Sequence, residues 1–275
     1  MSAARRPRRV AGPTPEHPVE RGHSGGGARH GATRDAGLTG STEDYLKAIY
    51  ELERTDGAAA TSDIAKRLAI APPSVTGMVR RLVALELITH ERYRGVTLTP
   101  AGRRAALGML RRHRIIEAYL SRALGYPWDR VHDEAERLEH AASDELIDRM
   151  ATAIGEPAVD PHGSPIPTRE GAVLELSQRM LAEQPVGERT RVSSVSDDDP
   201  EMLRYCATLA IRPGATVMVI ERAPFDGPIV VEVGGTAGTP GARHAVGSTL
   251  ARAVYVDAPR EAHRGAGRRR RPRAR

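Results

Sequence analysis

The sequence predicts a mainly α-helical chain with a small β-rich module near its C-terminal end. Apolar residues recur at helical spacing through most of residues 41–160, which is typical of amphipathic helices. From residue 189 onward they gather in short β-branched runs, TRVSSV, ATVMVIE, IVVEV and ARAVYV, which favour the strands of a compact barrel. The 275 residues are enough for two or three domains with buried cores.

The charge of the chain is unevenly distributed. The net charge is +6, but residues 1–40 carry +4 and residues 259–275 carry +7, so residues 41–258 carry −5. Residues 64–104 nevertheless hold eight Lys and Arg against two Glu, and this local excess favours contact with nucleic-acid phosphates. The single cysteine, Cys206, excludes an internal disulfide framework, and no apolar run is long enough to span a membrane. We therefore expect a cytoplasmic protein without a membrane partner.

The first elements predict a winged helix-turn-helix. Residues 1–40 are rich in Gly, Pro and Arg and lack apolar periodicity, so we expect a disordered basic tail. Two helices are expected to begin at the caps Ser41–Asp44 and Thr61–Asp63, followed by a helix from Pro73 to Leu85, strands at 87–91 and 95–99, and a long helix that opens at Pro100.

In a winged helix, the third helix enters the major groove and the hairpin touches the DNA backbone or the minor groove. The candidate DNA-contacting residues are small polar side chains and arginines of these two elements: Pro73, Ser74, Thr76, Gly77, Arg80, Arg81, Arg92, Tyr93 and Arg94. The alternative is that two helices and a hairpin form a common layout with solvated arginines.

A dense stripe of imidazoles and carboxylates predicts a metal site. His132, Glu136, Glu139 and His140 have offsets of zero, four, seven and eight, which place them on one face of a helix. His113 and Glu117 lie one turn apart on the preceding helix. Adjacent carboxylates repel, and a divalent cation would remove that cost. A charged helix face with i,i+4 ion pairs is the alternative.

The C-terminal half predicts a linker and a separate module. Residues 160–168 read as a turn, residues 170–183 as a helix, and a helix from Pro200 to Leu209 interrupts the β-type runs. His90, His162, His244 and His263 belong to no stripe, so we expect surface or structural roles for them. The predicted segments are a disordered tail (1–40), a winged-helix domain (41–105), a helical metal-binding and dimerisation domain (106–168), a helix and linker (169–188), a β module (189–258) and a basic disordered tail (259–275).

Several ordered motifs resemble one known family. STEDYLKAIYEL, IAPPSVTGMVRRL, ERYRGVTLTPAGRR, RRHRIIEAYL, VHDEAERLEHAASDE and GSPIPT together resemble the diphtheria toxin repressor family of metal-dependent transcriptional repressors. The resemblance covers about residues 41–168. Residues 189–256 are similar, more weakly, to the SH3-like, FeoA-type third domain of the longer members.

The resemblance implies two metal sites. The ancillary site would comprise His113, Glu117 and His132, with Asp197 as a further candidate, and the regulatory site would comprise Asp44, Glu136, Glu139 and His140. Iron-responsive members have Met and Cys where this chain has Asp44 and Glu136, so the chain resembles the manganese-responsive branch. Lys47 occupies a position where short manganese regulators carry a glutamate ligand, which favours two separate sites over a binuclear cluster of their type.

The resemblance also implies a function. The expected protein is a homodimeric repressor that binds double-stranded DNA at a palindromic operator, uses Mn(II) as corepressor and controls manganese transport genes. It would take no small-molecule substrate. Carboxylates and imidazole without sulfur suit Mn²⁺ or Fe²⁺, and other divalent transition metals would also bind in vitro.

The alternatives are an iron-responsive repressor of the same family, a metal-independent winged-helix regulator, and a metallo-hydrolase. The sequence contains no HExxH, nucleophile elbow or phosphate-cradling loop, which argues against an enzyme.

Overall fold

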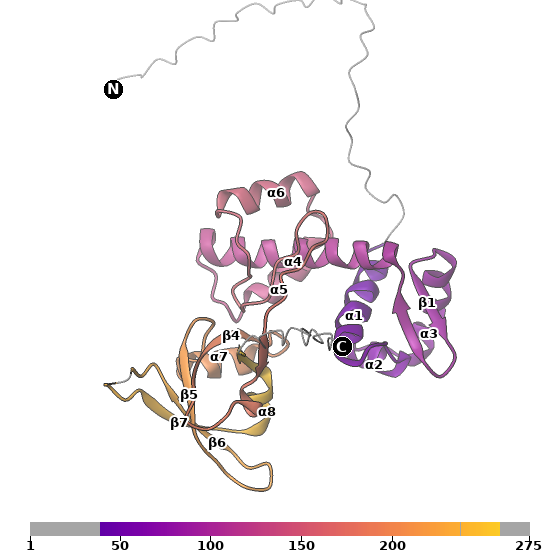
Figure 1. Ribbon diagram of the computed structural model, residues 1–275. Helices are drawn as coiled ribbons and strands as arrows, with labels where there is room; N and C mark the ends of the chain where they lie inside the picture. Colours follow the sequence, from indigo (N-terminus) through magenta and orange to yellow (C-terminus); the bar gives the residue numbers. More distant parts are fainter. Residues whose placement is uncertain (1–38, 237, 259–275) are drawn as a thin grey trace, which may run out of the picture. The chain divides into compact units, whose positions relative to one another are not determined.

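The computed structural model describes residues 39–236 and 238–258. The predicted tails at 1–40 and 259–275 lie outside this part of the chain, except for residues 39 and 40. The described residues form a mainly α-helical structure followed by an antiparallel sheet, which confirms the predicted fold class (Figure 1). Buried apolar side chains gather in three separate cores.

The first core belongs to a winged helix-turn-helix. It comprises α1 (Gly40–Asp56), α2 (Thr61–Arg67), α3 (Pro72–Ala84), β1 (Ile88–Glu91) and β2 (Gly95–Leu98). The two strands pair antiparallel, with Ile88 opposite Leu98. Leu46, Ile64, Val75 and Leu82 are fully buried, because the apolar stripe of each helix faces this core.

Helix α4 (Pro100–Leu124) connects this core to the next one. The Thr99 side chain caps its first turn by accepting from the backbone N–H of Gly102. Gly102 is required here, because a Cβ at this position would lie 1.9 Å from the carbonyl oxygen of Leu87. Leu107 and Leu110 of α4 pack in the first core, whereas later residues pack with α5 (Val131–Glu139) and α6 (Asp144–Ala153).

A six-stranded antiparallel sheet forms the C-terminal unit. Its strands run in the order β3-β8-β4-β5-β6-β7, with α7 packed in the same core. Figure 1 labels β4, β5, β6, β7 and α7 of this unit. The elements are β3 (Gln178–Met180), the 3₁₀ turn η1 (Leu181–Glu183), β4 (Arg189–Val195), α7 (Pro200–Thr208), β5 (Thr216–Arg222), β6 (Ile229–Val233), β7 (Ala242–Val246), α8 (Ser248–Ala253) and β8 (Val254–Asp257). The helix predicted from Pro200 to Leu209 is thus confirmed as α7.

The helix predicted at residues 170–183 is wrong. Residues 171–177 have no regular structure, and β3 and η1 follow. The physical reason is that the apolar residues of this segment pack into two different hydrophobic cores, so they do not form the single apolar face of one helix. Val173 packs against the winged-helix core, whereas Leu181 is buried in the core of the sheet.

Two strand predictions also need correction. ARAVYV was expected to be a strand, but its first three residues end α8 and only Val254 onward forms β8. Strand β7 was not predicted, because its residues are mostly exposed and show no apolar alternation. Pairing with β6 stabilises β7, and short-range sequence patterns do not reveal that pairing.

Candidate metal centres and DNA-binding surface

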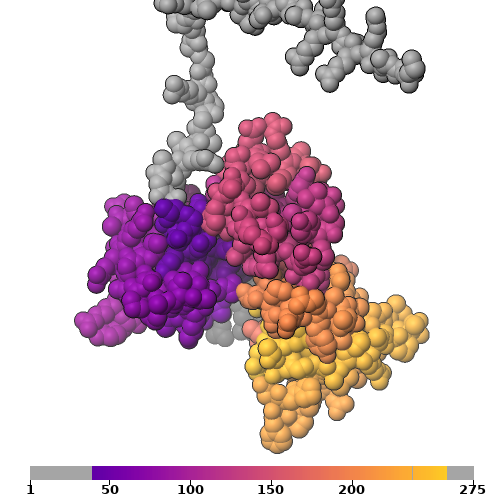
Figure 2. Space-filling model, turned by 180° about the vertical axis from the view of Figure 1, so that it is seen from behind, coloured from indigo at the N-terminus to yellow at the C-terminus, as the bar shows by residue number. Residues whose placement is uncertain are grey.

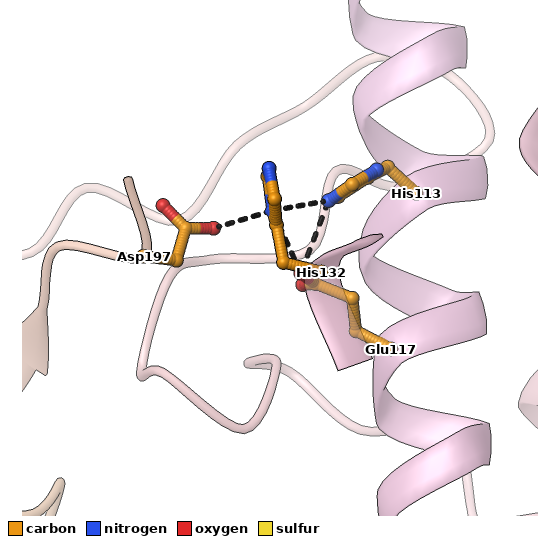
Figure 3. Close-up of side chains that lie close together, drawn as sticks. All are labelled: His113, Glu117, His132 and Asp197. Atoms are coloured by element: carbon orange, nitrogen blue, oxygen red, sulfur yellow. Dashed lines mark hydrogen bonds and ion pairs between the residues drawn. The ribbon is translucent and has the colours of Figure 1, made fainter. Parts of the chain in front are cut away.

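Four side chains converge between helices α4 and α5 and the loop after β4. We call His113, Glu117, His132 and Asp197 the tetrad; Figure 3 shows them pointing toward one another. Nε2 of His113 lies 3.0 Å from Oε1 of Glu117 and 3.1 Å from Nδ1 of His132. Nδ1 of His132 lies 3.3 Å from the same Glu117 oxygen and 3.4 Å from Oδ2 of Asp197. Two ligands about 2.1 Å from one ion lie at most about 4.2 Å apart, so these spacings fit a shared metal.

The local structure explains this convergence. His113 and Glu117 are one turn apart on α4, so their side chains point the same way. His132 lies in the first turn of α5, which packs on α4. Nδ1 of His113 donates to Oε2 of Glu139 over 2.6 Å, which leaves Nε2 directed into the tetrad. Metal-binding histidines commonly have such a partner on their second nitrogen.

The tetrad holds strongly coupled charges. Burial alone would lower the pKa of His132, but hydrogen bonds and charge from Asp197 and Glu117 raise it to about 11. Burial likewise opposes protonation of His113, whereas Glu117 raises its pKa to about 9. Burial would raise the pKa of Asp197, but its bond to His132 lowers this pKa to about 2. In the absence of metal, protons on the imidazoles therefore neutralise the carboxylates, and an incoming metal ion must displace them.

A second cluster joins α1 to the end of α5. Nε2 of His140 lies 3.1 Å from Oδ1 of Asp44 and 3.8 Å from Oε1 of Glu139. Nδ1 of His140 contacts Oε2 of Glu43 at 2.9 Å, a partner that the sequence analysis missed. We call Asp44, Glu139 and His140 the α1–α5 cluster; each offers a ligand atom within 4.8 Å of the others.

Glu136 was predicted as a ligand of the same site, but the structure does not bring it into this cluster. Its Oε1 atom lies 3.2 Å from Nζ of Lys47, and the side chain is 53% exposed. Lys47 is also 3.2 Å from Oε1 of Glu139. The ammonium group holds both carboxylates, so Glu136 faces Lys47. One cavity of about 720 Å³ is lined by residues of both clusters and by Glu136 and Lys47.

Two further residues near the tetrad were not predicted as functional. His162, for which we expected a surface or structural role, is fully buried, and Asp160 is 3% exposed. With Glu117 they form a third group of potential ligands. The segment DPHG had indicated a turn, and no helical spacing marked these residues; the fold brings them beside α4. His90 is exposed and His244 half-buried, while His263 lies outside the described residues.

All nine predicted DNA-contacting residues are exposed on α3 or on the hairpin. Val75 and Val79 of α3 are buried, so the opposite face of the helix presents the predicted residues. At the hairpin tip, Tyr93 is 91% exposed and the Arg92 guanidinium lies 4.9 Å from its ring centre. The winged-helix segment that carries these residues is coloured indigo to purple in Figure 2. The arrangement presents cations and small polar groups that suit contact with DNA.

Three family models match the chain. Residues 37–96 match "Iron dependent repressor, N-terminal DNA binding domain", and residues 99–168 match "Iron dependent repressor, metal binding and dimerisation domain". Residues 179–258 match "FeoA domain".

The chain is 40% identical over 116 residues to the HTH-type transcriptional regulator MntR of Bacillus pumilus. The matched residues cover 42% of this chain and 80% of that protein. The chain belongs to the diphtheria toxin repressor family. This repressor is also 40% identical over 130 residues to the diphtheria toxin repressor of Corynebacterium jeikeium, across 47% of its own length and 54% of that relative. Among solved structures, a manganese-dependent transcriptional repressor in complex with manganese has a TM-score of 0.72 and 39% identity, covering 78% of this chain and 99% of that one.

The repressor is therefore a divalent-metal-dependent, DNA-binding member of a family of transcriptional repressors. Its partners are DNA and a second copy of the chain. The family consists of repressors and not of enzymes, so the metallo-hydrolase alternative is wrong. None of the helices in the described residues is long and apolar enough to cross a membrane.

Proposed function

We propose that this repressor responds to Mn(II), binds a palindromic operator as a C2 dimer in the cytoplasm, and represses manganese transport genes. The observation that carries this proposal is the donor set of the α1–α5 cluster. Asp44, Glu139 and His140 supply carboxylate and imidazole and no sulfur. Such a set suits Mn²⁺ and Fe²⁺ better than thiol-preferring ions. The single cysteine, Cys206, is buried in the core of the sheet and belongs to none of the ligand clusters among the described residues.

The two clusters take different roles in this proposal. The α1–α5 cluster is the regulatory site, with Glu136 joining it when the metal displaces Lys47 from that carboxylate. The tetrad is the ancillary site. Asp44 precedes the DNA-reading helix in the chain, and Glu139 and His140 follow it. A cation bound by these residues would connect α1 to α5. It would thereby hold α3, the helix that contacts DNA, in one position relative to α4 and α5.

Dimer geometry completes the mechanism. Two winged helices held at a fixed spacing match two half-sites of a palindrome, with α3 in the major groove and Arg92 and Arg94 near the backbone. The metal shifts the population toward this arrangement through its higher affinity for it. Iron is the second candidate, because two of the matching family models are described as iron dependent.

The test is a capture of genomic fragments by the purified full chain with Mn²⁺, with Fe²⁺ under anaerobic conditions, and with a chelator. We expect one palindromic sequence, recovered with Mn²⁺ and absent under chelation. Equal recovery under chelation would contradict metal gating, and recovery with Fe²⁺ at lower free-metal concentration would contradict the choice of manganese. As a further arm, Asp44→Met with Glu136→Cys should shift the response toward Fe²⁺, because a thioether and a thiol soften the donor set.

A further inference from the structure

One ring nitrogen of His140 faces the α1–α5 cluster, and the other contacts a carboxylate outside it. Nε2 lies 3.1 Å from Oδ1 of Asp44, whereas Nδ1 lies 2.9 Å from Oε2 of Glu43. An ionised carboxylate has no hydrogen to donate, so the Nδ1–H group of His140 donates to Glu43. A neutral imidazole carries one proton, and a proton held on Nδ1 leaves the lone pair of Nε2 for a metal ion. The contact with Glu43 therefore favours the tautomer that can act as a ligand through Nε2.

Glu43 lies next to a predicted ligand in the chain but does not share its position in the site. Consecutive residues of a helix point about 100° apart, and Glu43 and Asp44 accordingly reach opposite nitrogens of one ring. Glu43 belongs to none of the ligand groups that the described residues form. Metal-binding histidines commonly donate their second N–H to a carboxylate of this kind, which fixes the orientation of the ring.

The carboxylate of Glu43 is itself held by an arginine of α4. Its Oε1 atom lies 3.5 Å from Nη1 of Arg112. The same guanidinium group donates through Nε and Nη2 to Oδ1 of Asp144 in the first turn of α6, over 3.1 and 2.8 Å. The side chains of Glu43 and Arg112 are only 18% and 22% exposed. Each oxygen of Glu43 thus has a partner, which restricts rotation of the carboxylate.

The backbone of α1 contacts the same ring. A Cβ on Gly40, the first residue of α1, would lie 3.4 Å from Cγ and from Nδ1 of His140. The first turn of α1 therefore packs against the edge of the ring that carries Nδ1. Together with the hydrogen bond to Glu43, this packing limits the orientations that the imidazole can adopt.

The alternative is that Glu43 only connects α1 to α4. A second ion pair already does so without a histidine. Nη2 of Arg103 on α4 lies 2.6 Å from Oε2 of Glu53 on α1, and the Glu53 side chain is 12% exposed. Glu53 therefore resembles Glu43 in its helix, its burial and its arginine partner, and it provides a matched control.

We propose that Glu43 is a positioning residue of the regulatory site. Its carboxylate holds His140 as the Nδ1–H tautomer with Nε2 directed toward Asp44, and Arg112 holds that carboxylate in place. Glu43 itself binds no metal ion. This inference rests on the proposed function, in which the α1–α5 cluster is the regulatory site.

The first measurement is the Mn²⁺ affinity of the full chain, by calorimetric titration of the wild type and of single variants. Glu43→Ala should weaken binding at the regulatory site by about 10–100-fold, as expected for loss of a residue that supports a ligand. Glu43→Gln should weaken it by less than about 10-fold, because the amide oxygen still accepts from Nδ1–H. The control Glu53→Ala should retain the wild-type affinity. Asp44→Ala identifies which step of the titration belongs to the regulatory site.

The second measurement is the tautomer of His140. In the Zn²⁺-loaded protein with ¹⁵N-labelled histidine, long-range ¹H–¹⁵N correlation spectra show which ring nitrogen carries the proton, and the His140→Gln variant assigns the signal. We expect the proton on Nδ1 in the wild type and in Glu53→Ala. A merely structural ion pair between α1 and α4 would not set this tautomer.

Wild-type affinity in Glu43→Ala, an equal loss in Glu43→Gln and Glu43→Ala, or an equal loss in Glu53→Ala would each overturn the positioning role. Metal on Nδ1 of His140 would also overturn it. The wild-type spectrum decides the question even if thermal melts show that Glu43→Ala does not fold. If Asp44→Ala changes no step of the Mn²⁺ titration, the regulatory site is wrongly assigned, which is a failure of the proposed function.

Discussion

Asp44 is the residue through which the DNA-binding unit reaches the proposed regulatory metal. It lies on α1, and its Oδ1 atom is 3.1 Å from Nε2 of His140. Partial burial raises the pKa of this carboxyl, while His140 and Lys47 lower it. The carboxylate therefore has cationic partners in the metal-free protein, and a metal ion would replace them.

We predict that Asp44→Ala abolishes metal-dependent DNA binding while the protein stays folded. Loss of a residue that only hydrogen-bonds a metal ligand weakens metal binding by up to about 100-fold. Loss of a ligand itself should therefore weaken Mn²⁺ binding at the regulatory site by at least about 100-fold. Fluorescence anisotropy with operator DNA across a Mn²⁺ series measures this effect. Asp63→Ala, which removes a carboxylate paired only with exposed Lys66 among the described residues, is the control and should behave as wild type. Unchanged Mn²⁺ dependence in Asp44→Ala would rule out the mechanism.

At the scale of elements, ion pairs between histidines and glutamates connect α4 to α5. His113 of α4 lies between Glu117 of the same helix and Glu139 of α5, and His132 of α5 contacts Glu117. The pKa values of His113 and His132 are raised to about 9 and about 11, from 6.5. Folding therefore favours the protonated forms of His113 and His132. Their contribution to the free energy of unfolding is complete below about pH 6.5 and is lost as the pH rises through the two raised pKa values.

We therefore predict that the metal-free protein becomes less stable between pH 6.5 and pH 9, by up to about 3 kcal/mol from His113 alone. Urea denaturation at several pH values measures the change. His113→Gln should reduce this dependence, and His132 should account for what remains. With Mn²⁺ bound the trend should reverse, because low pH favours the protons that compete with the metal. Equal stability of the metal-free protein across this range would contradict the raised pKa values of His113 and His132.

At the scale of the whole molecule, the loop after β4 contacts two other units through adjacent carboxylates. Asp197 contacts His132 of the tetrad, whereas Asp198 pairs with Arg67 of α2 at 2.7 Å. Arg67 also pairs with Glu51 of α1 at 2.6 Å. Metal binding at the tetrad would thus restrict the motion of the loop after β4, which also contacts the helix-turn-helix.

We predict that Asp197→Asn and Asp198→Asn have separable effects. Asp197→Asn removes a charged ligand, so metal should raise the melting temperature less than in the wild type, as expected for a weaker-binding ion. Asp198→Asn leaves the ligands in place and should retain the full metal-induced shift. Differential scanning calorimetry with and without Mn²⁺ distinguishes them. The reverse order of effects would assign the ligand role to Asp198.

The sequence by itself determined the winged helix, the helix pair with the metal stripe and the presence of a β module. These features follow from local spacing: His113 and Glu117 share a helix face because they are four residues apart, and a proline pair, Pro72 and Pro73, opens α3 one residue before the predicted start. The caps were less accurate, since α1 begins at Gly40, before the predicted cap at Ser41.

The tertiary structure alone decided which charged groups meet. Lys47 draws Glu136 out of the α1–α5 cluster, and a turn that carried no helical pattern brings Asp160 and His162 to Glu117. It also decided that residues 170–183 form no helix, because Val173 and Leu181 pack in different cores. Local spacing fixes the direction of a side chain within one element, whereas ligand sets depend on contacts between residues far apart in the chain. Those contacts are set by the packing of whole elements.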